Sequence, residues 1–145
     1  MKVKELMTEN PETVAPGTYI ADVARLMRDL DVGIIPVVND DELAGVITDR
    51  DITIRVTAAG LNPFEVTVQD FISPNPVTVS PGDDIKKARD LMSENQIRRL
   101  LVTEGNKLVG IVSIGDIATK GDDKDAATGE ALEEISEPNK YTNPA

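Results

Sequence analysis

The stretch Gly-Val-Ile-Thr-Asp-Arg-Asp at residues 45–51 returns as Gly-Ile-Val-Ser-Ile-Gly-Asp at residues 110–116. In both, an apolar run typical of a strand leads to a hydroxyl residue, which an Asp follows three positions later. Working outward, residues 3–52 align without a gap to residues 68–117 at an offset of 65 (68 − 3), and 15 of the 50 aligned positions are identical. Unrelated segments would share about 3 or 4. The chain is therefore a tandem duplication.

The sequence of each copy predicts the same order of secondary-structure elements, βαββα. A short helical turn ends at an Asn-Pro dipeptide, and a brief extended piece and a Pro-Gly turn follow. An amphipathic helix comes next, with its apolar residues at spacings of three and four. These are Ile20, Val23, Leu26, Met27 and Leu30 in the first copy, and Ile85, Ala88, Leu91 and Met92 in the second. Two β-branched runs form a hairpin (34–38 with 43–48; 100–103 with 108–113), and a second helix begins at Asp49 and at Ile114.

One copy of about 50 residues buries too little surface to be stable alone, so two copies should cover each other. We predict an α/β (α+β) fold in which two βαββα repeats are related by a pseudo-two-fold axis, with ligands in the clefts between them. The domain limits are 1–60 for repeat 1, 61–120 for repeat 2 and 121–145 for an acidic extension. Within the last part, residues 119–127 predict an acidic loop, and 128–136 a short helix with Ala131, Leu132 and Ile135 inward.

Composition excludes several classes of function. The chain contains neither Cys nor His, so it lacks thiol nucleophiles, the commonest general base and the commonest metal ligand. We therefore predict that it is not an enzyme and needs no metal. Its net charge of −11 is unfavourable for binding nucleic acid. No apolar run is long enough for a membrane span and no signal peptide precedes the fold, which predicts a cytoplasmic protein. The acidic stretch 121–137 is interpreted as solvated chain or as a cation site.

The repeated hydroxyl-x-x-Asp pattern has two interpretations. It is a capping box, in which the hydroxyl accepts from a first-turn amide and the carboxylate complements the helix. It is also suited to a nucleotide, because free amides at a helix start bind phosphate and an Asp accepts hydrogen bonds from a ribose diol. The occurrence of the pattern in both copies favours the second interpretation.

The doubled pattern resembles a pair of cystathionine β-synthase (CBS) domains, called a Bateman module. The resemblance covers about residues 3–117, and the family signature Gly-hydrophobic-x-Ser/Thr-x-x-Asp closes each repeat. Residues 32–38 resemble the family's second strand, and so do residues 97–102 except that Leu101 replaces the usual Pro. The resemblance implies a two-site module for AMP, ADP, ATP or S-adenosylmethionine, commonly assembled as a dimer.

The resemblance also implies that each pocket is shared between the repeats. The first pocket would contain Thr48, Asp51, Thr67, Ile97, Arg98 and Arg99. The second would contain Ser113, Asp116, Gly33 and Ile34, with backbone near Lys2. Because the first copy has Gly33 and Ile34 where the second has Arg98 and Arg99, we expect phosphates in the Thr48 pocket; solvated surface is the alternative interpretation of the two arginines.

These observations predict a sensor that binds an adenosine nucleotide, AMP or ATP above all, and relays occupancy to an unknown partner protein. The alternatives are a structural or dimerisation module with empty pockets, or an S-adenosylmethionine binder. We expect a homodimer, with Ile52, Ile54 and Val56 around the second helix as candidate contacts. Arg50 opposes the dipole at the helix start, and it either pairs with Asp49 or reaches a phosphate.

Overall fold

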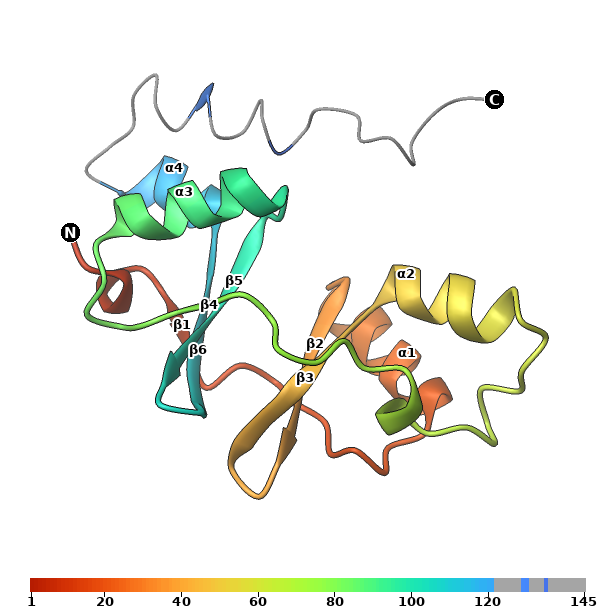
Figure 1. Cartoon of the computed structure of the whole chain (residues 1–145). Helices are drawn as coiled ribbons and strands as arrows, with labels where there is room; N and C mark the ends of the chain where they lie inside the picture. The colour runs from red at the N-terminus through yellow and green to blue at the C-terminus, as the bar shows by residue number, and fades with distance from the viewer. Residues whose placement is uncertain (122–128, 131–134, 136–145) are drawn as a thin grey trace. The chain divides into compact units, whose positions relative to one another are not determined.

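The computed structural model describes residues 1–121, 129–130 and 135 (Figure 1). The chain divides into two compact units. Unit 1 contains Met1–Pro11, Val77–Gly105 and the chain from Val109 onward, and unit 2 contains Glu12–Pro76 with Asn106–Leu108. Each unit has its own hydrophobic core.

Unit 2 is built on an antiparallel hairpin of β2 (Ile34–Asn39) and β3 (Glu42–Thr48). Asp40 and Asp41 form its turn with positive φ values of 50° and 65°, a geometry that favours Asn, Asp and Gly. Val14 adds a parallel bridge beside β2, at Val37, and Ser73 adds an antiparallel bridge beside β3, at Val46. The helices of unit 2 are α1 (Ile20–Leu30), α2 (Asp49–Asp51), a π-helix (Ile52–Thr57) and a 3₁₀ turn (Val68–Asp70).

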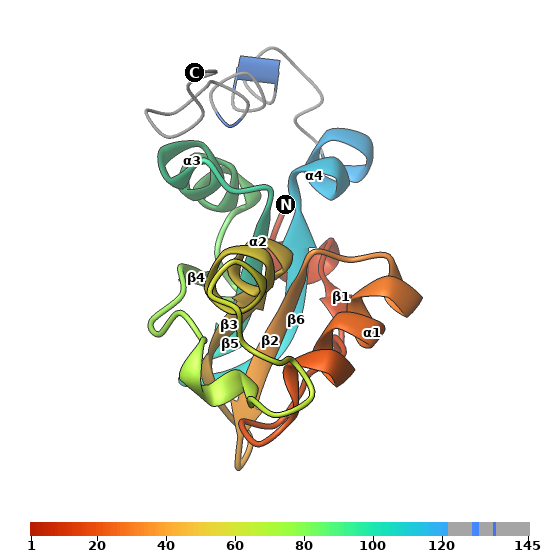
Figure 2. The same cartoon turned by 90° about the vertical axis from the view of Figure 1, so that its right-hand side faces the viewer.

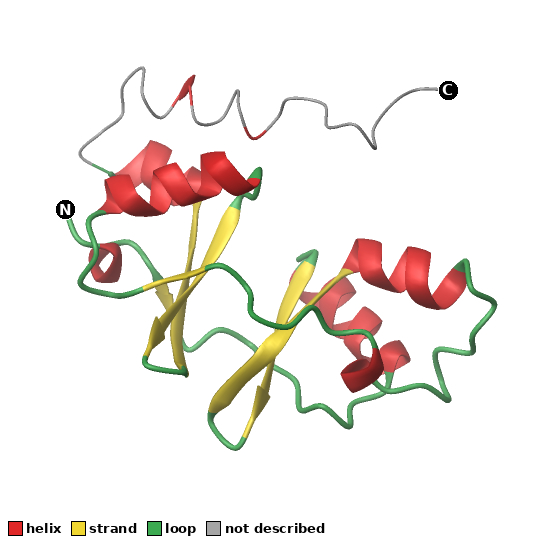
Figure 3. Ribbon diagram, in the orientation of Figure 1, coloured by secondary structure: helices red, strands yellow, loops and turns green. Residues whose placement is uncertain are grey.

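Unit 1 repeats this arrangement. β5 (Arg99–Glu104) and β6 (Lys107–Ser113) are neighbours, β4 (Thr78–Val79) is parallel to β5, and β1 (Thr8–Glu9) is antiparallel to β6. The pair Val79–Val102 matches Val14–Val37 after subtraction of 65. The helices are a 3₁₀ turn (Val3–Glu5), α3 (Ile85–Asn95) and α4 (Ile114–Lys120), with α3 and α4 on one side of the strands (Figures 2 and 3). Both units thus combine parallel and antiparallel strand pairings.

The first segment of each copy lies in the unit built by the other copy. Residues 1–11 open the first repeat, yet Val3 and Leu6 are buried in the core of unit 1. In the same way, Val68 and Phe71 open the second repeat and are buried in the core of unit 2. The packing units therefore differ from the sequence repeats at their amino-terminal ends.

Aliphatic side chains make up most of both cores, and Phe71 adds an aromatic ring to that of unit 2. Ile20, Val23 and Met27 of α1 are buried in unit 2, and Ile85, Ala88 and Met92 of α3 are buried in unit 1. Leu26 and Leu91 pack against these cores in part. The prediction for Leu30 was wrong: it is 41% exposed, because α1 ends there and the chain turns at Asp31 with a φ of 56°.

The second helix of the first copy begins at Asp49 as predicted, but most of it is a π-helix. Amide-to-carbonyl bonds from Ala58 to Thr53 and from Leu61 to Val56 span five residues. Val56 is fully buried in this geometry, so it is not available to a partner and its prediction as a dimer contact was wrong. Ile52 packs partly against the core, and only Ile54, 46% exposed, presents a large part of its side chain to solvent.

The carboxyl-terminal predictions are tested in part. α4 extends to Lys120, so residues 119 and 120 belong to this helix and not to the predicted loop. Ile135 is buried in the unit 1 core, as predicted. Ala131, Leu132 and residues 122–128 lie outside the described residues. Across the part of the chain that was placed, none of the helices combines the length and the apolar character that a membrane crossing requires.

Candidate ligand site

The two hydroxyl-x-x-Asp turns have the same geometry. The amide of Asp51 donates to Thr48 Oγ1 at 3.1 Å, and the amide of Thr48 donates to Asp51 Oδ2 at 2.9 Å. In the second copy, the amide of Asp116 donates to Ser113 Oγ at 3.0 Å and the amide of Ser113 donates to Asp116 Oδ2 at 3.2 Å. Both turns are complete capping boxes, so the capping interpretation is confirmed. Because each box occupies only one carboxylate oxygen, it does not exclude a ligand.

The start of the hairpin lies beside each turn. The amide of Asp49 donates to the Gly33 carbonyl at 3.0 Å, and Ile34 pairs with Thr48. A side chain at position 33 would begin 3.0 Å from Asp49 Oδ2, so the exposed Asp49 side chain would have to move to admit one.

In unit 1 the amide of Ile114 donates to the Arg98 carbonyl at 2.8 Å, again at an offset of 65. Here the buried Ile114 replaces Asp49, and Arg98 stands where the first copy has Gly33. This backbone hydrogen bond is thus present in both copies, whereas the side chains at the strand start differ in charge.

The segment before each first helix also lies in the unit of its predicted pocket. Thr67 precedes the 3₁₀ turn Val68–Asp70 and pairs with Tyr19, within the unit that holds Thr48 and Asp51. Lys2, its equivalent at an offset of 65, pairs with Asp84 within the unit that holds Ser113 and Asp116. Thr67 and Lys2 thus each lie in the same unit as the turn to which they were assigned, and the pockets themselves stay a prediction.

The remaining predicted residues belong to the opposite unit in each case. Ile97, Arg98 and Arg99 lie in unit 1, and Gly33 and Ile34 lie in unit 2. Their assignment to the Thr48 pocket and the Ser113 pocket, respectively, therefore stays a prediction.

The surroundings of Lys2 include two carboxylates that favour their ionised form. The pKa of Asp83 is lowered because its carboxylate accepts from the Ser80 amide at 2.9 Å, and the Lys87 ammonium at 3.3 Å adds to the effect. The pKa of Asp84 is lowered because its carboxylate accepts from the Lys86 amide at 2.9 Å. Both carboxylates are therefore ionised at neutral pH, and the positive charges of Lys2, Lys86 and Lys87 lie close to them.

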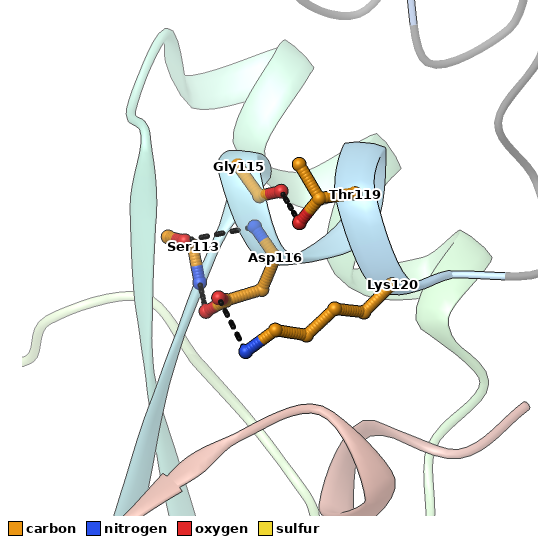
Figure 4. Close-up of polar contacts among 5 residues, drawn as sticks. All are labelled: Ser113, Gly115, Asp116, Thr119 and Lys120. Atoms are coloured by element: carbon orange, nitrogen blue, oxygen red, sulfur yellow. Dashed lines mark hydrogen bonds and ion pairs between the residues drawn. The ribbon is translucent and has the colours of Figure 1, made fainter.

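A cation missed from the sequence lies at the second turn. Lys120 Nζ is 3.8 Å from Asp116 Oδ1, while Oδ2 of the same carboxylate accepts from the Ser113 amide (Figure 4). An acid and a base four residues apart on a helix are neighbours, and this spacing was the available signal.

At the first turn, the backbone amide of Arg50 donates to Asp49 Oδ1 at 2.8 Å, so one oxygen of that carboxylate is bonded to the backbone.

The chain is similar in sequence and in fold to known proteins. A family model described as "CBS domain" matches residues 3–57 and again residues 68–122. The "CBS domain-containing protein YhcV" of Bacillus subtilis (strain 168) is 41% identical over 137 residues, 94% of this chain and 96% of that protein.

Two solved structures have similar folds. One is the crystal structure of Hypoxic Response Protein I with two coordinated zinc ions, with a TM-score of 0.76 and 33% identity over 83% of this chain and 98% of that one. The other is the crystal structure of CBSX2 in complex with AMP, with a TM-score of 0.70 and 28% identity over 81% of this chain and 93% of that one.

The zinc ions of the first structure have no evident counterpart here. Cys and His supply most zinc ligands in proteins, and this sequence has neither. The residues that the structure describes also contain no group of three or more carboxylates placed to hold a metal ion.

Proposed function

The chain belongs to the CBS-domain family and carries the domain twice, and from this premise we propose that it is a regulatory module that binds an adenosine nucleotide. AMP, ADP and ATP are the candidate ligands, and a change of conformation would relay their binding to a partner protein. The observation that carries the proposal is the pair of matched turns at Thr48–Asp51 and Ser113–Asp116. The AMP bound by CBSX2 supports this ligand class.

In the proposed site, the ribose hydroxyls donate to Oδ1 of the Asp carboxylate, the oxygen that does not take part in the capping box. Within the described part of the chain, no donor contacts Oδ1 of Asp51. The Thr48 pocket is completed by Thr67, Ile97, Arg98 and Arg99, and the Ser113 pocket by Gly33, Ile34 and backbone near Lys2. The proposal includes no catalytic step, because without His or Cys we assign neither a general base nor a thiol nucleophile.

Replacement of the turn carboxylates tests the proposal. Asp51→Ala and Asp116→Ala should each weaken AMP binding at one site by about tenfold to a hundredfold, since hydrogen bonds to charged groups contribute about 1.5–3 kcal/mol. Calorimetry measures this loss. Asp29→Ala, which removes an exposed carboxylate of α1, is the matched control and should leave affinity unchanged.

The same variants separate binding from capping. If the turns serve only as caps, the wild-type protein binds no adenosine compound, and the variants lose about 0.5–2 kcal/mol of stability with no affinity to lose. A thermal-shift panel of AMP, ADP, ATP and S-adenosylmethionine identifies the ligand, because a ligand at 100 times its Kd stabilises the fold by about 2.7 kcal/mol.

We further propose that the protein is a homodimer that uses the exposed surface of unit 2. Ile54 and Leu30 are 46% and 41% exposed, whereas the equivalent positions of unit 1 are Thr119 and Asn95. Ile54→Glu should shift the protein toward monomer in sedimentation velocity, because it places a charge in an apolar contact. Thr57→Glu, at an exposed position of the same helix, is the control. A wild-type protein that sediments as a monomer at micromolar concentration would contradict this proposal.

A further inference from the structure

The Ser113–Asp116 turn carries a positive charge of its own. The Lys120 ammonium lies 3.8 Å from Asp116 Oδ1, and its side chain is 66% exposed, whereas that of Asp116 is 24% exposed (Figure 4). Exposed pairs of this kind are weak, and a lysine stem is flexible. Lys120 can therefore leave the carboxylate at little cost when another donor or another anion arrives.

The equivalent cation of the first copy is held elsewhere. Position 120 corresponds to position 55 at an offset of 65, where the residue is Arg55. Arg55 donates from Nη1 to the Phe71 carbonyl at 2.8 Å, and its guanidinium lies 5.8 Å from the centre of the Phe71 ring. A second interaction with the same residue fixes the guanidinium in place, so Arg55 holds the second helix against the segment of the following repeat. The basic residue after the Asp is thus movable in one copy and structural in the other.

Charge decides what this difference means for a ligand. A nucleotide brings its negative phosphate to a protein of net charge −11, so the general field opposes binding and a local cation must offset it. Ribose hydroxyls that donated to Asp116 would replace Lys120 at that carboxylate. The released ammonium would then lie beside the bound ribose, and an ammonium binds phosphate as a point charge.

We propose that Lys120 selects a phosphate-bearing ligand at the Ser113–Asp116 turn, which makes this turn a nucleotide site rather than a nucleoside site. The inference rests on the proposed function and adds to it the residue that sets ligand charge. It differs from the expectation that phosphate binds only where Arg98 and Arg99 are assigned. The Ser113 site has its own cation, supplied by the helix that carries Asp116.

The test compares AMP with adenosine, which differ only in the phosphate. Asp51→Ala removes the first turn's carboxylate, and Lys120→Met, Lys120→Arg or Lys86→Met is added to it. Lys86 is an exposed lysine of α3 in the same unit and controls for the loss of one charge. Circular dichroism verifies that each variant is folded. Lys120→Met should weaken AMP binding about tenfold, a change of 1.4 kcal/mol, and leave adenosine binding unchanged or tighter. Lys120→Arg should retain AMP binding.

The outcomes separate the two levels of the proposal. If Lys120→Met weakens AMP binding no more than Lys86→Met does, or weakens AMP and adenosine equally, the assignment to Lys120 is wrong while the nucleotide site stands. If the wild-type protein binds neither compound, the proposed function is wrong and the role of Lys120 is wrong with it.

Discussion

Deletion of residues 1–11 should unfold unit 1, although these residues begin the repeat that builds unit 2. Val3 is fully buried and Leu6 is 5% exposed in the unit 1 core. The amide of Val3 donates to the Asp83 carbonyl at 2.9 Å, and the amide of Lys4 donates to the Pro81 carbonyl at 3.0 Å. Burial of two such side chains contributes about 3–6 kcal/mol, comparable to the whole stability of a small domain.

Hydrogen exchange read by mass spectrometry locates the effect. After the deletion, peptides from α3, β5 and β6 should exchange faster than peptides from α1, β2 and β3. The opposite order would show that the amino-terminal segment stabilises its own repeat.

Single substitutions provide a milder version of the same experiment. Val3 and Val68 are equivalent at an offset of 65, and both are fully buried. Each change to Ala should cost about 2 kcal/mol. Val3→Ala should act first on unit 1 and Val68→Ala first on unit 2.

Substitution of Gly45 by Ala should be the most damaging single change in the turn signatures. A Cβ at position 45 would lie 2.5 Å from the Ser73 carbonyl oxygen, which belongs to the segment that passes over β3. Two backbone hydrogen bonds hold that segment to β3. The Val46 amide donates to the Ser73 carbonyl at 3.2 Å, and the Ser73 amide donates to the Val46 carbonyl at 2.9 Å. The backbone at Gly45 or Ser73 has to move to admit the methyl group. We expect the free energy of unfolding, measured by urea denaturation, to fall by about 3 kcal/mol.

Gly110→Ala is the informative comparison. There a Cβ would lie 2.7 Å from Met7 Sδ and 3.0 Å from the Thr8 carbonyl oxygen. The Met7 side chain can rotate away, so the loss should be smaller, about 1–2 kcal/mol. Gly17 has no atom within 4 Å of its Cβ position, and Gly17→Ala should change stability by less than about 0.5 kcal/mol. Equal effects at Gly45 and Gly17 would contradict the packing explanation.

The glycine of the signature therefore has a physical role in packing that is separate from any ligand. In both copies it lies where the opening segment of the other repeat crosses the second hairpin strand. Strand β1 pairs Glu9 with Gly110, and Ser73 pairs with Val46 next to Gly45. A side chain at either position would push the crossing segment away.

The candidate site was predictable to the extent that it is local. The capping boxes at Thr48–Asp51 and Ser113–Asp116 follow from a hydroxyl and an acid three residues apart, and their hydrogen bonds are as the pattern requires. The partner of Lys120 was predictable from the spacing of four residues between Asp116 and Lys120. The partner of Arg55 was not, because the Phe71 carbonyl that holds Arg55 lies 16 residues away in a different repeat.

The sequence by itself determined the duplication, the order of elements, the hairpins and the capped turns, because each depends on residues a few positions apart. Only the tertiary structure decided which unit each opening segment completes. Val3 and Val68 are the same residue at equivalent positions, so either segment has the apolar residues to fill either core, and no local pattern distinguishes the choices. The choice of core for each opening segment depends on the chain that connects the two segments and on which apolar faces become buried in the folded protein. For the same reason Val56, apolar like Ile54, became core while Ile54 stayed at the surface.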